Sequence, residues 1–408
     1  MAFAPLNSAN AMASAEAVVK NYADIAQAGY EDSLSTAKAM KRALDLFLSN
    51  PSAESLKAAR EAWVAARRPY QQTEVYRFGN PIVDEWEGKV NAWPLDEGLI
   101  DYVAGEYGDS SEENPFYVAN VIANKSVKAG GKQIDASNIT ADVLESLQEV
   151  GGVEANVATG YHAIEFLLWG QDLNGNGAGA GNRPHTDFDT ANCTGGNCDR
   201  RGAYLKAATD LLIKDLEDIV AAWSAGGDAR KAVESDPGST GLTAILTGMG
   251  SLSYGELAGE RMKLGLLLHE PEEEHDCFSD NTHESHYFDA LGIRNIYHGK
   301  YTRVDGSVVE GPSISDLVKA KSADIDAAIR SGLDATQEKM SVMKTRAETK
   351  ERYDQMIGEG NDEGNAVVQA AIDALVAQTR SIEKAFKLLD LKMSIEGSDS
   401  LDNPSAVK

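Results

Sequence analysis

Apolar side chains recur at spacings of three and four residues over long stretches, and this period constrains the fold more than any other feature of the sequence. One stripe comprises Leu56, Ala59, Trp63, Ala66 and Tyr70. Another comprises Leu205, Leu212, Leu216, Ile219, Val220 and Trp223. Such spacing places the apolar residues on one face of an α-helix. Proline, which breaks helices, occurs only 11 times in 408 residues, so we predict an all-α fold.

The length of the chain predicts two helical halves, because 408 residues exceed what one simple core usually serves. We expect two four-helix-bundle-like halves packed together, with irregular insertions. The N-terminal bundle should cover residues 12–171 and the C-terminal bundle residues 199–392, joined by a glycine-rich linker loop at 172–198. The first helix, expected over 12–49, should break at 28–30, where a glycine lies.

The net charge of −26 excludes some classes of partner. Phosphate backbones would repel such a chain, so we expect no nucleic-acid partner. No apolar run approaches the roughly 18–20 residues of a membrane helix. Near the N-terminus, Ala9-Asn10-Ala11 fits the small-x-small pattern of a signal-peptide cleavage site, but a charged start and a long apolar stretch are missing. A trimmed export signal and a start unrelated to export are both consistent with this segment.

Three cysteines bear on the cellular compartment. Cys193 and Cys198 enclose the short glycine-rich sequence TGGN, which favours a disulfide and an oxidising compartment. A metal site is the alternative, but no second cysteine pair would complete it. Cys277 remains, either as a free buried thiol or as part of the histidine-rich segment around it.

The stretch GYHAIEFLLWG, residues 160–170, carries two ionisable side chains within an apolar run. On a helix, His162 and Glu165 would project from one face. Imidazole and carboxylate are common ligands of iron and zinc. The alternative is a buried pair bonded to each other or to neighbouring helices, because unpaired polar groups are costly to bury.

A second candidate is the segment EPEEEHDCFSDNTHESH, residues 270–286, which includes His275, His283 and His286. It could supply metal ligands to a site elsewhere in the fold, or it could be a solvated acidic loop. The loop sequence DLNGNG, from Asp172, resembles the first half of a calcium-binding loop. Its twelfth position is Arg183 instead of glutamate, so we expect no calcium there.

Several separate motifs together resemble the imelysin-like family, in its iron-regulated protein A branch. They are Gly160-x-His162-x-x-Glu165 with Trp169-Gly170, Trp63-x-x-x-Arg67, Phe78-Gly79, Trp93-Pro94-Leu95-Asp96 and FSDNTH at 278–283. The resemblance implies an exported bacterial protein, periplasmic or at the cell surface, made under iron limitation. It also implies an all-helical fold of two halves, with the His/Glu motif near their interface.

The resemblance implies a metal site, whose residues can be assigned in this chain one by one. Only His162 and Glu165 match the defining motif, and we infer His283 from the FSDNTH stretch as a third ligand. The expected supporting or ligand-binding residues are Trp63, Arg67, Glu74, Asp96, Glu256 and Arg261. Iron is the expected metal and zinc the second choice. Bare or chelated iron would be the ligand, and a transporter component of the inner or outer membrane a candidate partner.

Two other functions stay open. A zinc metallopeptidase of the imelysin type would need three protein ligands, an open position for water and a general base. H-x-x-E supplies two ligands at most, so the catalytic set is incomplete and we expect no enzyme. A binding module without metal is the other alternative, with His162 and Glu165 as a buried lock between helices.

Overall fold

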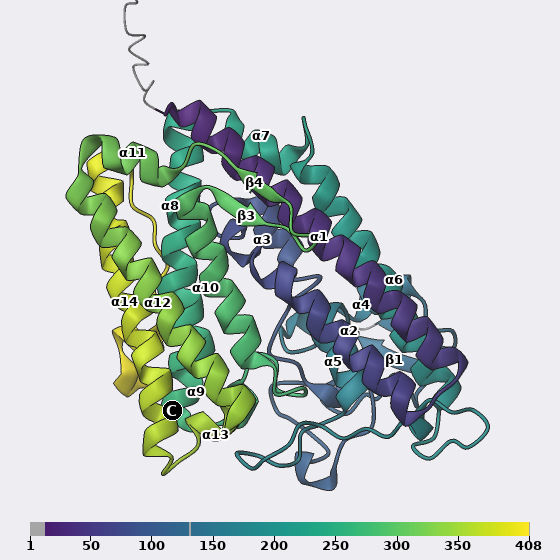
Figure 1. Ribbon diagram of the computed structural model, residues 1–408. Helices are drawn as coiled ribbons and strands as arrows, with labels where there is room; N and C mark the ends of the chain where they lie inside the picture. The colour runs from purple at the N-terminus through teal and green to yellow at the C-terminus, as the bar shows by residue number, and fades with distance from the viewer. Residues whose placement is uncertain (1–12, 130–131, 408) are drawn as a thin grey trace, which may run out of the picture.

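The computed structural model describes residues 13–129 and 132–407. Long helices build the molecule, with two short antiparallel hairpins at its edges, so the predicted all-α class is confirmed (Figure 1). The tripeptide Ala9-Asn10-Ala11 lies outside the described residues. No helix in the described ranges is long and apolar enough to cross a membrane.

Four helices form the first bundle. They are α1 (Ala15–Ser49), α2 (Ala53–Gln71), α5 (Gly160–Trp169) and α6 (Cys198–Trp223). The side chain of Ser14 caps α1 by accepting from the Ala17 amide. The expected break in α1 is wrong, because the helix continues through Gly29. A Cβ at Gly29 would lie 3.1 Å from Thr73 Cγ2, so the glycine serves close packing instead of a turn.

The helix α6 lies beyond the loop at 172–198 but packs with the first bundle. It contacts α1 along its length and also contacts α5 and α4 (Ala141–Leu147). The stripe that includes Leu212 and Leu216 is the face it buries there. The first four-helix group therefore crosses the division expected at 172–198, since α5 alone is too short to cover α1 and α2.

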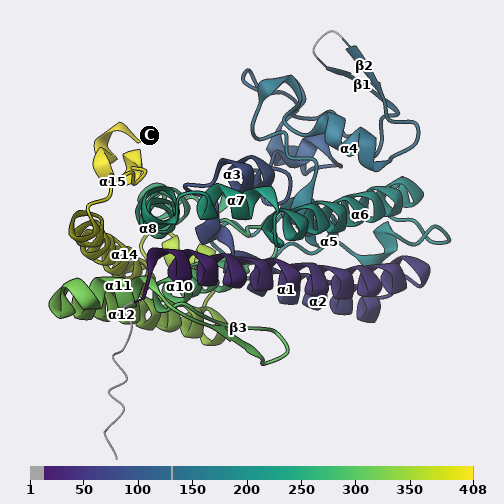
Figure 2. The same cartoon turned by 90° about the horizontal axis from the view of Figure 1, so that it is seen from above.

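The second bundle is built around one long helical rod. Its elements are α8 (Leu242–Ser251), the π-helix η7 (Leu252–Lys263), α9 (Leu264–Leu268), α10 (Thr282–His298), α12 (Ala323–Thr349) and α14 (Asp362–Leu389). The first three continue into one another as the rod. Seen from above, α8, α10, α12 and α14 gather on one side of the molecule, and α1, α2, α5 and α6 on the other (Figure 2).

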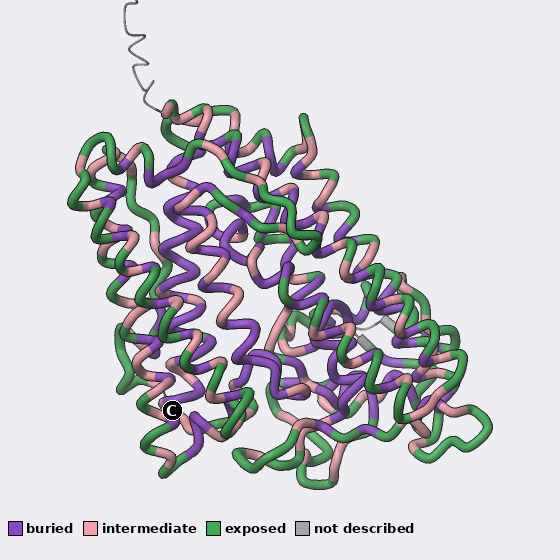
Figure 3. The backbone as a smooth tube through the Cα atoms, in the orientation of Figure 1, coloured by how far each residue is buried: buried purple, intermediate pink, exposed green. Residues whose placement is uncertain are grey.

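Contacts between α2 and α10 join the two bundles. Buried residues run continuously through this junction, which places polar as well as apolar side chains inside the molecule (Figure 3). The long connection from α2 to α5 covers the first bundle. It contains η1 (Glu74–Tyr76), α3 (Pro81–Glu87), η2 (Glu97–Leu99), η3 (Gly105–Tyr107), β1 (Ser126–Ala129), β2 (Lys132–Asp135), α4 and η4 (Val150–Gly152).

The remaining short elements connect or cover the bundles. They are η5 (His185–Asp187), α7 (Asp228–Glu234), η6 (Pro237–Gly241), η8 (Pro271–Glu273), β3 (Lys300–Thr302), β4 (Val308–Glu310), α11 (Ile314–Lys321), α13 (Tyr353–Ile357), α15 (Asp399–Asp402) and η9 (Pro404–Ala406). The β3–β4 hairpin pairs Tyr301 with Val309 and lies along α1.

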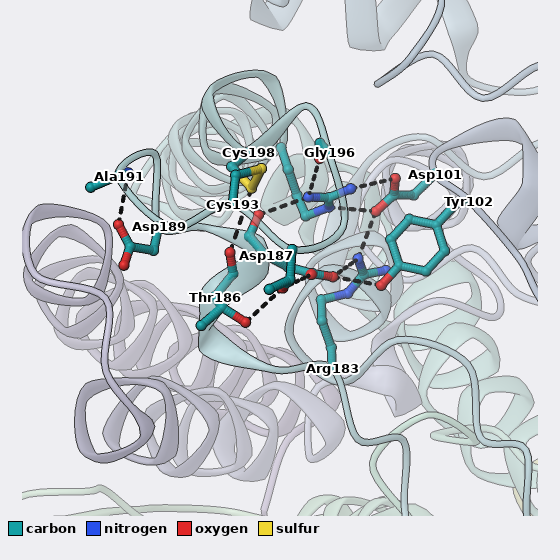
Figure 4. The surroundings of a disulfide bond; sticks show 12 residues. Asp101, Tyr102, Arg183, Thr186, Asp187, Asp189, Ala191, Cys193, Gly196 and Cys198 are labelled. Carbon is teal, nitrogen blue, oxygen red and sulfur yellow. Dashed lines mark hydrogen bonds and ion pairs between the residues drawn. A yellow bond between two sulfur atoms is a disulfide. The ribbon is translucent and has the colours of Figure 1, made fainter.

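A disulfide corner fixes the start of α6 (Figure 4). Cys193 and Cys198 are bonded, with their Cα atoms 5.9 Å apart. Below them Arg201 Nε donates to Asp101 Oδ2 at 2.6 Å, and Arg183 Nη1 donates to the same oxygen at 2.7 Å. The loop at 172–198 is therefore fastened at its end by a covalent bond and a buried ion network. Cys277 is the one free thiol among the described residues.

Candidate metal centre

Steric crowding explains why the G-x-H-x-x-E motif begins with glycine. Gly160 begins α5 with φ of +79°, and a Cβ there would lie 2.4 Å from the Val90 carbonyl oxygen. Only glycine fits such a close approach with a positive φ. The Tyr161 amide then donates to that carbonyl at 2.8 Å. This contact fixes the first turn of α5 and so sets the direction of the next side chain, His162.

His162 and Glu165 are hydrogen-bonded to each other inside the protein. The His162 Nδ1 to Glu165 Oε2 distance is 3.0 Å, and both side chains are almost completely buried. The other carboxylate oxygen of Glu165 accepts from the amide and the hydroxyl of Ser279, at 3.0 and 2.6 Å. Glu165 is thus satisfied from both sides, whereas His162 Nε2 has no partner among the described residues.

The unpartnered histidine belongs to a group of three potential ligands. The group consists of His162, His275 and Asp276. One potential ligand atom from each residue lies within 4.8 Å of those of the other two. The two imidazole rings meet edge to face, with centroids 4.8 Å apart. All three side chains are at most 1% exposed. Two imidazoles and one carboxylate are a donor set that suits iron or zinc.

Arg67 on α2 holds Asp276 in place. Its Nη2 donates to Asp276 Oδ1 at 2.6 Å, and the second oxygen of Asp276 accepts from Asn281 and Ser285. Burial alone would raise the pKa of Asp276, but the charge of Arg67 and the hydrogen bonds from Ser285 and Asn281 hold it at about 2. Asp276 therefore stays ionised in the interior, and its charge is compensated by a guanidinium.

The histidines of the centre are neutral. Burial, followed by the charge of Arg67, lowers the pKa of His162 to about 3. Burial and Arg261 lower the pKa of His275 well below its usual range and that of His286 to about 3. Neutral imidazole is the form that binds metal. Burial and the nearby Asp276 raise the pKa of Glu165 well above its usual range.

The polar interior continues from this group toward α10 and η7. His286 stacks above His275 with ring centroids 6.5 Å apart, and neither His286 nitrogen has a hydrogen-bond partner in the described parts of the chain. Arg261 ends this network, donating to Glu74 at 2.6 Å, to Asp289 at 3.2 Å and to Glu256 at 2.9 Å.

The π-helix η7 explains how Glu256 and Arg261 meet. Residues five apart do not lie above one another on an α-helix, but the wider π-turn brings them to one face. Glu256 can then accept from Arg261 while Arg261 reaches inward to Glu74 on η1. The π-stretch therefore directs a guanidinium into the junction of the bundles.

A cavity of about 450 Å³ reaches His275, whereas His162 and Asp276 do not line it. Arg261 and Trp93 are also among its lining residues. Six carboxylates also line it: Asp84, Glu87, Glu149, Glu154, Glu256 and Glu260. Burial, followed by the charge of Glu74, raises the pKa of Glu87 to about 7. The cavity presents an excess of acidic groups to anything that enters.

The structure brings together only part of the predicted site. Arg67 contacts the ligand group directly, Glu74, Glu256 and Arg261 form the adjoining network, and Trp63 donates to the Tyr161 carbonyl at 3.0 Å. His283 and Asp96 lie outside. His283 Nε2 faces Arg352 at 3.5 Å, and Asp96 accepts from Asn114 in the connection between α2 and α5.

Sequence reasoning did not assign Asp276, and it named His275 and His286 only as members of a segment. That segment is not a solvated loop, because Glu274, His275, Asp276, Asp280 and His286 are all buried. The alternation of acidic residues and histidines in this segment was the one sequence signal that pointed to a site there. Their partners on α2 and α5 are too distant in sequence for spacing to reveal.

Fold and site together define an all-α protein of two helical bundles with a buried histidine and carboxylate centre at their junction. The imelysin family model matches residues 26–382. The chain belongs to the imelysin family.

Two relatives support this placement. The chain is 24% identical to iron-regulated protein A of Synechococcus elongatus over 278 residues, which are 65% of this chain and 59% of that protein, so it spans less than two thirds of that relative's length. A crystal structure from Parabacteroides distasonis, provisionally assigned as an iron-regulated protein A precursor, superposes with a TM-score of 0.64. It has 17% identity and covers 93% of this chain and 97% of that one. At this identity the likeness concerns the fold.

Proposed function

We propose that the chain is an exported iron-binding protein of bacterial iron acquisition. In this proposal iron is cargo, held by His162, His275 and Asp276 where the two bundles meet. The observation that carries it is the His162 side chain, whose buried Nε2 has no partner among the described residues and which forms a group with two further potential ligands. The names of the two relatives direct the proposal toward iron. Zinc is the second metal that the donor set suits.

The donor chemistry fits a transition metal. A buried imidazole nitrogen without a partner loses hydrogen bonds to water and gains nothing, so a metal ion would compensate its burial. In this proposal Glu165 accepts from Nδ1 of His162, the nitrogen that lies 4.0 Å from Asp276 Oδ1, and the unpartnered Nε2 is the ligand atom. Glu165 then orients the histidine instead of binding the metal itself, as second partners of metal-bound histidines commonly do.

Arg67 and Arg261 make the centre better suited to iron accompanied by an anion than to a bare ion. Arg67 already pairs with Asp276, so a cation bound by Asp276 would lie close to a guanidinium. Arg261 lines the acidic cavity. Once Asp276 binds the cation, Arg67 loses its main carboxylate partner, and a small carboxylate or phosphate chelator would replace it. The acidic cavity would attract the cation itself.

Burial argues against the peptidase alternative. His162, His275 and Asp276 are at most 1% exposed, and a peptide bond must reach a catalytic metal. Glu165, the nearest candidate for a general base, is engaged by His162 and Ser279. An ion or a small chelate entering through the cavity needs far less room than a polypeptide. We propose release to, or uptake from, a membrane transporter component as the next step.

The direct test compares three alanine variants for Fe²⁺ binding by calorimetry without oxygen. His162→Ala and His275→Ala should each weaken binding by more than about a hundredfold, because a ligand change exceeds the 10- to 100-fold effect of supporting residues. His283→Ala is the matched control from the same segment and should retain the affinity. Bound iron should also raise the melting temperature of the wild type.

The result that overturns the assignment is specific. Normal iron affinity in His275→Ala together with loss in His283→Ala would restore the ligand set expected from the sequence. Normal affinity in all three variants would place the metal elsewhere.

A further inference from the structure

Three carboxylates from separate segments converge beside the histidine centre without being part of it. Glu274 follows η8, Asp280 lies in the turn before α10, and Asp354 lies on α13. One carboxylate oxygen from each residue lies within 4.8 Å of those of the other two. The chain folds back over some 70 residues to bring Asp354 to this point, so local sequence does not explain the meeting.

All three side chains are buried, and most of their oxygens have no partner. Their exposures are 0% for Glu274, 3% for Asp280 and 2% for Asp354. In the described ranges, both carboxylate oxygens of Glu274, both of Asp354 and one of Asp280 accept no hydrogen bond. The hydroxyl of Thr282 lies near Glu274 and the amide of Gln355 near Asp354, but neither reaches acceptable hydrogen-bond geometry.

The surroundings add negative charge. Asp172, the first residue of DLNGNG, acts on both Asp280 and Asp354 through its charge, and the cation that opposes it is Arg352. The same loop is anchored here, because Asn176 donates to the Asp354 carbonyl at 2.8 Å and the Gly181 amide donates to the Phe278 carbonyl at 2.9 Å. Several buried carboxylates without paired cations are unfavourable unless an ion compensates their charge or protonation removes it.

We infer a second metal site, in which Glu274, Asp280 and Asp354 bind a hard divalent cation, calcium first. All donors are oxygens, the ligand type that calcium prefers. Calcium to oxygen distances of 2.3–2.6 Å place opposite ligands up to about 5 Å apart, which accommodates separations within 4.8 Å. Magnesium, at 2.0–2.1 Å, places opposite ligands only about 4 Å apart and demands a near-ideal octahedron.

This site would support the histidine centre through the backbone. Glu274 precedes His275 directly, and Asp280 follows Ser279, which donates to Glu165. An ion held by Glu274 and Asp280 would fix both ends of the segment 274–280, which carries two of the three proposed iron ligands. It would also fasten this segment to α13 of the second bundle through Asp354. The inference rests on the carboxylate geometry and does not depend on the identity of the metal at His162.

The test uses calcium alone on the full chain freed of metal by a chelator, with calorimetry and thermal unfolding as readouts. The wild type should bind one calcium ion and melt at higher temperature in calcium than in EGTA. Asp354→Asn and Glu274→Gln should each weaken binding more than about tenfold, because calcium affinity follows the ligand charge count. Asp362→Asn, the same change at an exposed position on α14, is the matched control and should bind normally.

Thermal unfolding in EGTA separates a cation site from a structural role. Asp354→Asn should melt no lower than the wild type there, because it removes a repelling charge, and should lose the calcium-induced rise. His162→Ala should keep calcium binding, so failure of the iron proposal would leave this one standing. Calcium binding that survives in both Asp354→Asn and Glu274→Gln, or no binding by the wild type at millimolar calcium, would overturn the inference. Tighter binding of magnesium than of calcium would overturn the assignment to calcium.

Discussion

Two buried networks of charged residues lie in this molecule, and they differ in how completely their acceptors are satisfied. At the disulfide corner, both carboxylate oxygens of Asp101 accept from Arg201, and Arg183 adds a further donor. Asp187 accepts from Arg183 and Tyr102. Burial alone would raise the pKa of Asp101, but Arg201 and Arg183 hold it below its usual range.

At the junction of the bundles, several buried polar atoms lack hydrogen-bond partners in the described part of the chain. Arg67 satisfies Asp276, yet Nε2 of His162, both nitrogens of His286 and one oxygen of Asp289 have no partner among the described residues. Burial is equally deep in both networks. The difference teaches that burial of charge alone does not mark a functional centre. What distinguishes the junction is a set of unpartnered nitrogens on neutral imidazoles, whose burial costs stability.

We expect the largest loss of stability from Asp101→Ala, at the disulfide corner. The substitution leaves the guanidinium groups of Arg201 and Arg183 buried without their main partner. Breaking a buried ion network in this way costs roughly 3–5 kcal/mol in the free energy of unfolding. Urea unfolding followed by circular dichroism measures it. Iron affinity of the folded fraction should be unchanged, because the corner does not contact the proposed iron ligands.

A matched change on the surface provides the control for this prediction. Asp218→Ala removes an exposed acid from α6, whose partner Lys214 is also exposed. It should change stability by less than about 1 kcal/mol, as exposed ion pairs do. If Asp101→Ala were equally mild, the corner would not be the structural network described above.

An intermediate effect is expected from Glu165→Gln. The carbonyl oxygen of glutamine can still accept from Ser279, so the fold should persist, but an amide NH2 group, which cannot accept, replaces the oxygen that bonds His162 Nδ1. Loss of such an orienting partner reduces metal affinity about 10- to 100-fold. Calorimetry with Fe²⁺ measures the change. Ser279→Ala removes only one donor to Glu165 and should weaken binding less. A loss as complete as that of His162→Ala would mean that Glu165 binds the metal directly.

The sequence predicted the fold class because helical periodicity is a local property. Stripes such as the one through Leu212 and Leu216 specify a helix and its buried face wherever the helix packs. They do not specify the neighbour, which is why α6 was expected with the second bundle but packs on α1. The continuous α1 shows the same limit, since the role of Gly29 depends on Thr73, which lies in the turn after α2.

The candidate site was predictable only where its residues are adjacent in sequence. His162 and Glu165 share one helix, so their spacing revealed the pair. Asp276 becomes a site residue through Arg67, some 200 positions away, and no periodicity connects the two. The π-turn that aligns Glu256 with Arg261 was equally hidden, because the sequence 252–263 reads as an ordinary helix.

The smallest expected effect is a difference in how the stability of the two networks depends on pH. His286 is fully buried with a pKa lowered to about 3 by burial and Arg261, whereas the unfolded chain takes up this proton near pH 6.5. Between these values the unfolded state binds more protons, so stability falls as the pH falls from 6.5 toward 3. The contribution of one such histidine at pH 5 is about 1–2 kcal/mol. His286→Gln should therefore lose less stability than the wild type between pH 7 and pH 5.

Urea unfolding of metal-free protein at the two pH values gives the comparison. His185→Gln, in the loop before α6, is the matched control and should follow the wild type. Asp101 keeps its charge across this range because its pKa lies below the usual value, so the disulfide corner adds no slope. An equal loss in His286→Gln and the wild type would mean that His286 gains a proton while folded. Its nitrogens would then be partnered at neutral pH, and the contrast between the two networks would rest on His162 alone.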